Sequence, residues 1–194
     1  VNQDLITINY YYKLKSTKII INYLDEETNN ELATSTLLDK KYDDNYDVTG
    51  YKNNSNILSD YVFSKFTSST NNELTGVVNK NEIIINYYYK LKDAKILINY
   101  LIEGTNTKIA DSTNIQTKYG KQYDVTDYKD NKNIPNKYIY SKSSTEYPLS
   151  GTVNQDLITI NYYYKLKSAK IIVKYLENET NKILSNEYSS TIKY

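Results

Sequence analysis

The sequence predicts a mainly β protein, α+β at most, built from tandem modules. The first observation is an internal repeat, because the string YYYKLK begins at Tyr10, Tyr87 and Tyr162, at successive offsets of 77 and 75 residues. The second is that apolar and polar residues alternate with a period of two inside the repeated segments, as in half-buried strands. The third is that polar, turn-prone stretches separate these segments and leave room for little helix.

The first repeated segment, LITINYYYKL at residues 5–14, is predicted to be a strand. Its alternation creates one apolar face, formed by Ile6, Ile8, Tyr10 and Tyr12. The chain contains 24 Tyr, 2 Phe and no Trp, so tyrosine must supply much of the packing. We assign the last two residues of this face and their equivalents to the core or its rim, namely Tyr10, Tyr12, Tyr87, Tyr89, Tyr162 and Tyr164.

The second repeated segment, KIIINYL from Lys18, is predicted to be a strand whose core face is Ile19, Ile21 and Tyr23. The polar string DEETNNEL follows, and apolar residues resume at its end, which indicates a hairpin. Further along, YDVT and YVFSK favour short strands. The string YKNNSNI between them has room for one helical turn at most.

Only KLKSTK, Lys13 to Lys18, separates the closing strand of one module from the opening strand of the next. A linker this short prevents free tumbling, so we expect an elongated, semi-rigid rod. The predicted boundaries are the closing strand of a preceding repeat at 1–16, whole repeats at 17–92 and 93–167, and the start of a truncated third repeat at 168–194.

The order of these segments resembles the MucBP repeat, the mucin-binding-protein domain of Gram-positive bacterial surface proteins. The matching strings are INYLDEETNNEL, YDVTGY, YVFSK with LTGVV and IIINYYYKLK, then INYLIEGTNTKI, YDVTDY, YIYSK with LSGTV and ITINYYYKLK. The resemblance implies a β-grasp, ubiquitin-like module whose first and last strands lie side by side and parallel. One departure is that the glycine preceding the Y-x-V-T segment is matched by Gly120 but replaced by Asp43 in the first copy, so this turn is expected to differ between copies.

Composition argues against several classes of function. The formal net charge is +1, from 24 Lys and Arg against 23 Asp and Glu, so no field of one sign attracts nucleic acid. No apolar run approaches the roughly 20 residues of a membrane span, so we expect no membrane insertion. Without His or Cys, most nucleophilic and transition-metal sites are excluded. We therefore predict no enzyme activity, no catalytic residue and no cofactor.

The carboxylates Asp25, Glu26 and Glu27 could serve as a glycosidase pair, but they lie in a turn that reads Ile102-Glu103-Gly104 in the second copy. The same turn could hold Ca²⁺ through oxygen ligands. It lacks the alternating D-x-D-x-D spacing with which a loop wraps Ca²⁺. We therefore predict no metal and interpret the three carboxylates as solvated turn residues.

Three tyrosines lie on the polar face of the predicted closing strand, where an exposed ring can stack on the apolar face of a sugar. Asparagines on the same face can donate hydrogen bonds to such a ligand. The candidate glycan contacts are Tyr11, Tyr88, Tyr163, Asn9, Asn86 and Asn161. The alternative is that these tyrosines pack against a neighbouring strand or module.

The resemblance implies a repeat region of a bacterial cell-surface adhesin, extracellular or in the cell wall. Its partners are expected to be host or environmental glycoproteins, whose mucin-type or other glycans it binds weakly and multivalently. The alternative function is a non-binding structural stalk or fibre subunit that spaces or assembles surface domains. Export and anchoring signals are expected outside this chain.

A self-association follows from the phase of the repeats. Residues 1–16 are the same string as 153–168, so an unpaired closing strand could complete the truncated module at 169–194 of a neighbouring copy by strand addition.

Overall fold

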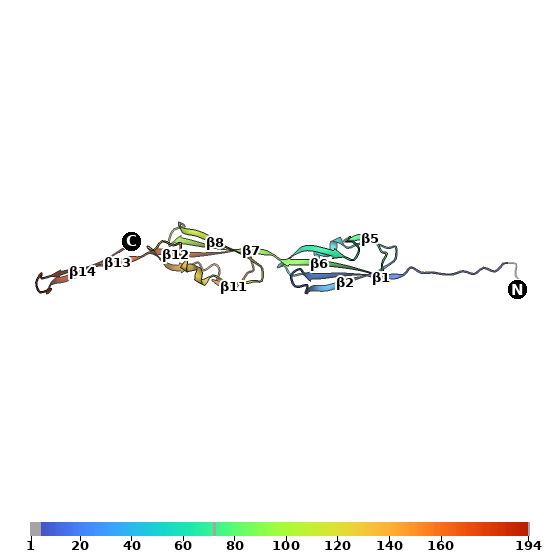
Figure 1. Cartoon of the computed structure of the whole chain (residues 1–194), viewed down its shortest axis with the longest axis horizontal. Coiled ribbons are helices and arrows are strands. Elements are labelled where there is room, and N and C mark those ends of the chain that lie inside the picture. The colour runs from blue at the N-terminus through green and yellow to red at the C-terminus, as the bar shows by residue number, and fades with distance from the viewer. Residues whose placement is uncertain (1–4, 72, 194) are drawn as a thin grey trace. The chain divides into compact units, whose positions relative to one another are not determined.

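The computed structural model describes residues 5–71 and 73–193, and the chain divides into two compact units, 1–92 and 93–194. Strands make up 57% of the structure and helix 5%, so the prediction of a mainly β protein with tandem repeats is confirmed. The first unit contains β1 (Ser16–Asp25), β2 (Glu31–Lys41), β3 (Asn45–Asp47), η1 (Thr49–Asn53), β4 (Tyr61–Ser68), β5 (Thr75–Val77) and β6 (Glu82–Leu91). The second contains β7 (Asp93–Ile102), β8 (Lys108–Lys118), β9 (Gln122–Asp124), η2 (Thr126–Asp130), β10 (Tyr138–Ser143), β11 (Ser150–Thr152), β12 (Leu157–Leu166), β13 (Ser168–Leu176) and β14 (Ile183–Lys193) (Figure 1).

Each unit is organised around a four-stranded sheet, with the order β2-β1-β6-β4 in the first and β8-β7-β12-β10 in the second. Strands β1 and β6 pair in parallel, with Ile19 opposite Ile83 and Tyr23 opposite Tyr87. Strands β7 and β12 pair in the same way. The first and last long strands are therefore parallel neighbours, as the resemblance implies, and the strand order is compatible with a β-grasp sheet. The helical part of each repeat is one five-residue 3₁₀ turn, η1 or η2.

A single residue, Lys92, separates β6 from β7 along the chain. This connection is shorter than the six residues expected from the sequence, because the two strands extend into the predicted linker. The elongated rod and the repeat boundaries stay predictions.

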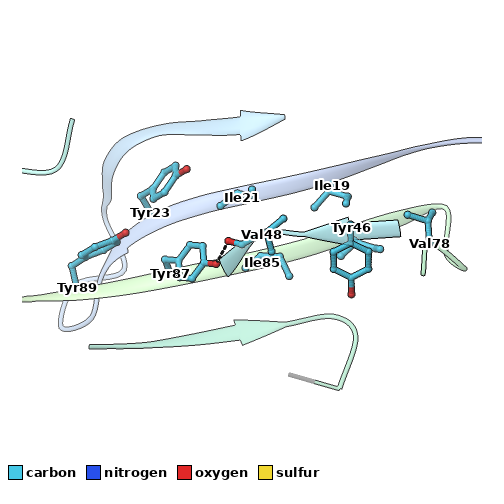
Figure 2. Packing of buried hydrophobic residues seen from close by; sticks show 10 residues of the cluster. Ile19, Ile21, Tyr23, Tyr46, Val48, Val78, Ile85, Tyr87 and Tyr89 are labelled. Atoms are coloured by element: carbon cyan, nitrogen blue, oxygen red, sulfur yellow. Dashed lines mark hydrogen bonds between the residues drawn. The ribbon is translucent and has the colours of Figure 1, made fainter. Parts of the chain in front are cut away.

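The core of the first unit lies on one face of its sheet. Ile19, Ile21 and Tyr23 of β1 are at most 1% exposed, which confirms the core face inferred from alternation. The rest of this core consists of Tyr46, Val48, Val78, Ile83, Ile85, Tyr87 and Tyr89 (Figure 2). In the second unit, Tyr162 and Tyr164 occupy the equivalent buried positions of β12.

The buried tyrosines need partners for their hydroxyls, because an unpaired polar group costs free energy in an apolar environment. The Tyr87 hydroxyl donates to the carbonyl oxygen of Val48 at 2.5 Å, as Figure 2 shows. The Tyr89 hydroxyl donates to the carbonyl of Lys52 at 2.7 Å. These bonds tie both ends of the η1 turn to the closing strand. The second unit repeats them, from Tyr162 to Val125 and from Tyr164 to Lys129.

The strand predicted at residues 5–14 is absent from this structure. Tyr10 and Tyr12 are 76% and 89% exposed, so their assignment to a core or its rim is wrong for this copy. The reason is that a closing strand is stabilised by pairing with strands that precede it, as β12 pairs with β7 and β10. Residues 5–14 pair with no strand among the described residues.

The turn before the Y-x-V-T segment is the same in both copies, which contradicts the expected difference. Asp43 takes the left-handed conformation with φ 67°, close to φ 73° at Gly120. Their amides donate to Val78 and Val153 respectively, both at 2.9 Å. Aspartate tolerates this conformation better than most residues with a Cβ, so the turn survives the substitution.

The hairpin of β13 and β14 resembles that of β1 and β2 in pairing but not in burial. Ile171, Val173 and Tyr175 are 44%, 38% and 49% exposed, whereas the equivalent Ile19, Ile21 and Tyr23 are covered. No closing strand pairs with β13 among the residues that the structure describes. The apolar face of this hairpin is therefore exposed.

The Tyr87→Phe substitution is expected to lower the free energy of unfolding by about 1–3 kcal/mol, because it leaves the Val48 carbonyl without its buried donor. Tyr88→Phe is the matched control, since Tyr88 is half-buried on the opposite face. We expect it to change the free energy by less than about 0.5 kcal/mol. Urea denaturation measures both, and equal stability of the two variants would contradict a structural role for the Tyr87 hydroxyl.

Raising the pH above about 10 is expected to destabilise both units. Burial raises the pKa of Tyr87, Tyr89 and Tyr162 to about 12, from 10.0 for a tyrosine in water. The unfolded chain therefore loses these protons first, so this contribution to stability is complete below about pH 10 and is lost as the pH rises to about 12. Melting temperatures followed by circular dichroism from pH 8 upward test this. A constant melting temperature throughout would contradict it.

Candidate functional site

The candidate residues of the two closing strands lie on the face of each sheet opposite the core, which we call the outer face. In β6 the residues alternate between buried and half-buried, and Asn86 and Tyr88 are half-buried. In β12 Asn161 and Tyr163 take the same positions. Asn9 and Tyr11 lie instead on the irregular segment before β1, where Tyr11 is 91% exposed.

The asparagines belong to a hydrogen-bonded row that crosses the sheet. Ser35 donates to the side-chain oxygen of Asn22 at 2.7 Å, and Asn22 donates to that of Asn86 at 2.8 Å. Asn86 in turn donates to the Thr67 hydroxyl at 3.2 Å. The second unit repeats the first two bonds with Ser112, Asn99 and Asn161. Asn86 and Asn161 therefore join strands, and each has fewer hydrogen-bonding positions left for a ligand.

Beside this row, each outer face carries a tyrosine–lysine–glutamate cluster. The Lys65 Nζ lies 5.4 Å from the centre of the Tyr88 ring and 2.9 Å from Glu26 Oε1. In the second unit, Lys142 lies 5.9 Å from the centre of the Tyr163 ring and 3.2 Å from Glu103 Oε1. The lysine thus bridges the ring and the carboxylate, a cation–π contact combined with an ion pair.

The carboxylates of these clusters are held in the ionised form. A hydrogen bond from Ser64 and then the neighbouring Lys65 lower the pKa of Glu26. Ser141 and Lys142 lower the pKa of Glu103 in the same way, and the Ser141 hydroxyl donates to Glu103 Oε2 at 2.7 Å. A carboxylate with a lowered pKa is a poor general acid at neutral pH, so the cluster suits binding better than acid catalysis.

The interpretation of the acidic turn as solvated residues is wrong for Asp25, whereas Glu26 is half-exposed and Glu27 is exposed. Asp25 is 9% exposed, and its Oδ1 accepts the backbone amides of Glu27 and Thr28 at 2.9 and 2.8 Å. Glu26 forms the ion pair with Lys65 across the sheet. The sequence contains a signal for this ion pair, because Glu26 and Lys65 both recur 77 residues later, as Glu103 and Lys142.

A groove of about 640 Å³ adjoins the cluster of the second unit. Tyr163 and Asn161 line it together with Lys142, and Ser143 and Ser144 add hydroxyls. This volume is within the range of small-molecule sites, and its lining combines one aromatic ring with several hydrogen-bonding groups. Such a lining suits a hydroxylated ligand.

Within residues 5–71 and 73–193, no group of three or more acidic side chains is arranged to hold a metal ion. In the same part of the chain, no helix has the length and apolar character needed to cross a membrane.

Comparisons with known proteins give one family match. The MucBP domain model matches residues 18–90 and 95–165. A comparison with curated proteins gives no match.

Three solved structures are similar at low identity. The type 2 repeat of the mucus binding protein MUB from Lactobacillus reuteri is 16% identical over 78% of this chain and 100% of that chain, with a TM-score of 0.31. Streptococcal High Identity Repeats in Tandem (SHIRT) domains 3–4 from a cell surface protein are 11% identical over 78% and 98%, with a TM-score of 0.32. Mub-RV is 12% identical over 77% and 99%, with a TM-score of 0.26. Similarities this low carry no argument about a ligand.

Proposed function

The chain belongs to the MucBP domain family, and from this premise we propose that its two whole repeats are glycan-binding modules of an extracellular bacterial surface adhesin. Family membership supports a repeat region of a surface adhesin. The proposal adds the ligand class, the glycans of mucin-type or other glycoproteins, and the outer face as the site.

The observation that carries the proposal is the half-exposed Tyr163 ring at the edge of a polar groove. A sugar ring can place its C–H face on the tyrosine while its hydroxyls bond to the serines and to Asn161. The Lys142–Glu103 pair holds the lysine beside the ring, which reduces the conformational entropy lost on binding. The same cluster at Tyr88 provides a second module, so weak sites combine through multivalency.

A non-binding stalk is the competing function. The support for it is the hydrogen-bonded asparagine row, which assigns Asn86 and Asn161 a structural role without any ligand. The lysine that contacts each tyrosine also belongs to the same module, so this contact forms without any ligand. A binding measurement separates the two functions.

The whole chain is expected to bind immobilised mucin and a subset of a glycan array, and Tyr88→Ser/Tyr163→Ser is expected to weaken this binding about tenfold or more, or about 1.4 kcal/mol. Leu58→Ser is the control, since Leu58 is 68% exposed in the loop before β4, outside both clusters and outside the exposed hairpin. Melting temperatures confirm that the variants fold. Unchanged binding by the double variant would exclude the outer-face site, and no binding by any variant or by the parent would favour the stalk.

We also propose self-association by strand addition, because the chain contains both an uncovered hairpin and a free copy of the strand that covers such hairpins. Residues 5–14 have the sequence of β12, whose Ile158, Ile160 and Tyr162 are at most 1% exposed against β7 and its neighbours. The equivalent Ile6, Ile8 and Tyr10 are solvent-exposed. Parallel pairing of this segment with β13 of a second copy covers both apolar surfaces.

Strand addition predicts that the chain forms oligomers whose mass increases with protein concentration. Light scattering after size-exclusion chromatography measures this mass. Ile8→Lys is expected to abolish them, because it places a charge on the face that packs against the hairpin. Thr7→Lys, on the opposite face of the same segment, is the control and is expected to retain them. A parent chain that stays monomeric at millimolar concentration would contradict the proposal.

A further inference from the structure

Both repeats contain a groove on the core side of the sheet, which we call the turn groove. It lies between the opening hairpin and the 3₁₀ turn, and its volume is about 700 Å³ in the first unit and about 580 Å³ in the second. In the first unit the lining includes Tyr23, Thr36, Tyr51, Asn54 and Asn56. In the second it includes the residues 77 positions later, Tyr100, Thr113, Tyr128, Asn131 and Asn133.

The bottom of each turn groove is a tyrosine–threonine pair. The Tyr23 hydroxyl and the Thr36 hydroxyl lie 2.9 Å apart, and those of Tyr100 and Thr113 lie 3.0 Å apart. Since each hydroxyl has one donor and two acceptor positions, the pair retains hydrogen-bonding capacity toward the groove. The bottom is therefore rigid, because the tyrosine is buried, and it is also polar.

The fold explains only some of the recurring residues. Tyr51 packs against the core, and the side chain of Asn54 accepts the backbone amide of Asn56 at 2.9 Å. The side chains of Asn56 and Asn133 are exposed and form no hydrogen bond with any described residue. Exposed neighbours in the same segment differ between the copies, since Asn53 becomes Asp130 and Ser55 becomes Lys132. Retention of this asparagine therefore points to a role outside the fold.

The chemistry of the turn groove selects a class of ligand. A carboxamide offers two donors and an acceptor, which matches neighbouring sugar hydroxyls that both donate and accept. The charges of the lining add up to −1 in each unit, from Asp47 in the first and from Asp127, Asp130 and Lys132 in the second. A carboxylated or sulfated sugar is disfavoured by this charge.

We propose that each turn groove is a second saccharide site, which binds neutral sugars and discriminates against anionic ones, with Asn56 and Asn133 as contacts. The saccharide class rests on the proposed function, whereas the groove is separate from the outer face, because Tyr23 and Tyr88 point to opposite sides of the sheet. Each module thus presents two sites, one on each side of its sheet.

The test is an NMR titration of the whole chain with N-acetyllactosamine, a neutral probe, and separately with 3′-sialyllactose, an anionic one. The neutral probe is expected to shift backbone amides at 49–56 and 126–133 with millimolar affinity, and the anionic probe to shift them less. The Asn56→Ala/Asn133→Ala variant is expected to raise the probe concentration needed to produce these shifts about fivefold, because one or two hydrogen bonds to the probe are lost. Asn30→Ala, at an exposed asparagine of the β1–β2 turn, is the control and is expected to leave them unchanged.

The readout is specific for each site. Shifts confined to the surroundings of Tyr88 and Tyr163 would overturn the turn-groove site and leave the outer-face site standing. Shifts confined to the turn grooves would support this inference and exclude the outer face as a saccharide site. Groove shifts of equal size in the asparagine variant, stronger binding of the anionic probe, or no shift at saturating probe would each overturn the inference.

Discussion

The hydrogen bond between a buried tyrosine hydroxyl and a backbone carbonyl is the interaction on which each module depends. Tyrosine supplies four of the ten buried residues of the first core, and each buried hydroxyl then needs a partner. Tyr87 and Tyr89 find acceptors at the two ends of the η1 turn. One pair of side chains thereby both fills the core and fixes the connection that covers it. The turn groove lies between this connection and Tyr23.

The two faces of the closing strand have different structural roles. Its inward tyrosines are constrained by packing, while its outward residues form the asparagine row and the tyrosine–lysine–glutamate cluster. The row joins the strands without using apolar area, which allows the outer face to stay polar and half-exposed. A face of this kind tolerates changes around Tyr88 without loss of the fold, because the core lies on the other side. The residues of the outer face are thus able to vary from repeat to repeat on a constant scaffold.

Much of the fold could be predicted from local sequence, since alternation alone identifies Ile19, Ile21 and Tyr23 as a core face. Local sequence does not determine a strand whose formation depends on pairing with another strand. Residues 5–14 and 157–166 have the same sequence, yet among the described residues only the second segment has strands to pair with. The Glu26–Lys65 pair depends on the register across three strands, which no single segment contains. The candidate tyrosines of β6 and β12 could be placed on the outer face, but the hydrogen-bonded state of their neighbouring asparagines could not. The turn at Asp43 is expected from the sequence to differ from that at Gly120, yet both are left-handed, because aspartate tolerates this conformation and the same hydrogen bond forms in both copies.

The parallel pairing of β1 and β6 determines how a module responds to mechanical load. The chain enters the pair at the Ser16 end and leaves it at the Leu91 end, so tension between these points acts along the strands. Such a force shears all the hydrogen bonds of the pair together, whereas an antiparallel pair pulled from one end opens bond by bond. Forced unfolding is governed by the rate of crossing the unfolding barrier, and simultaneous rupture raises that barrier. A module of this topology therefore resists tension applied between its two ends through its backbone pairing, without a covalent crosslink.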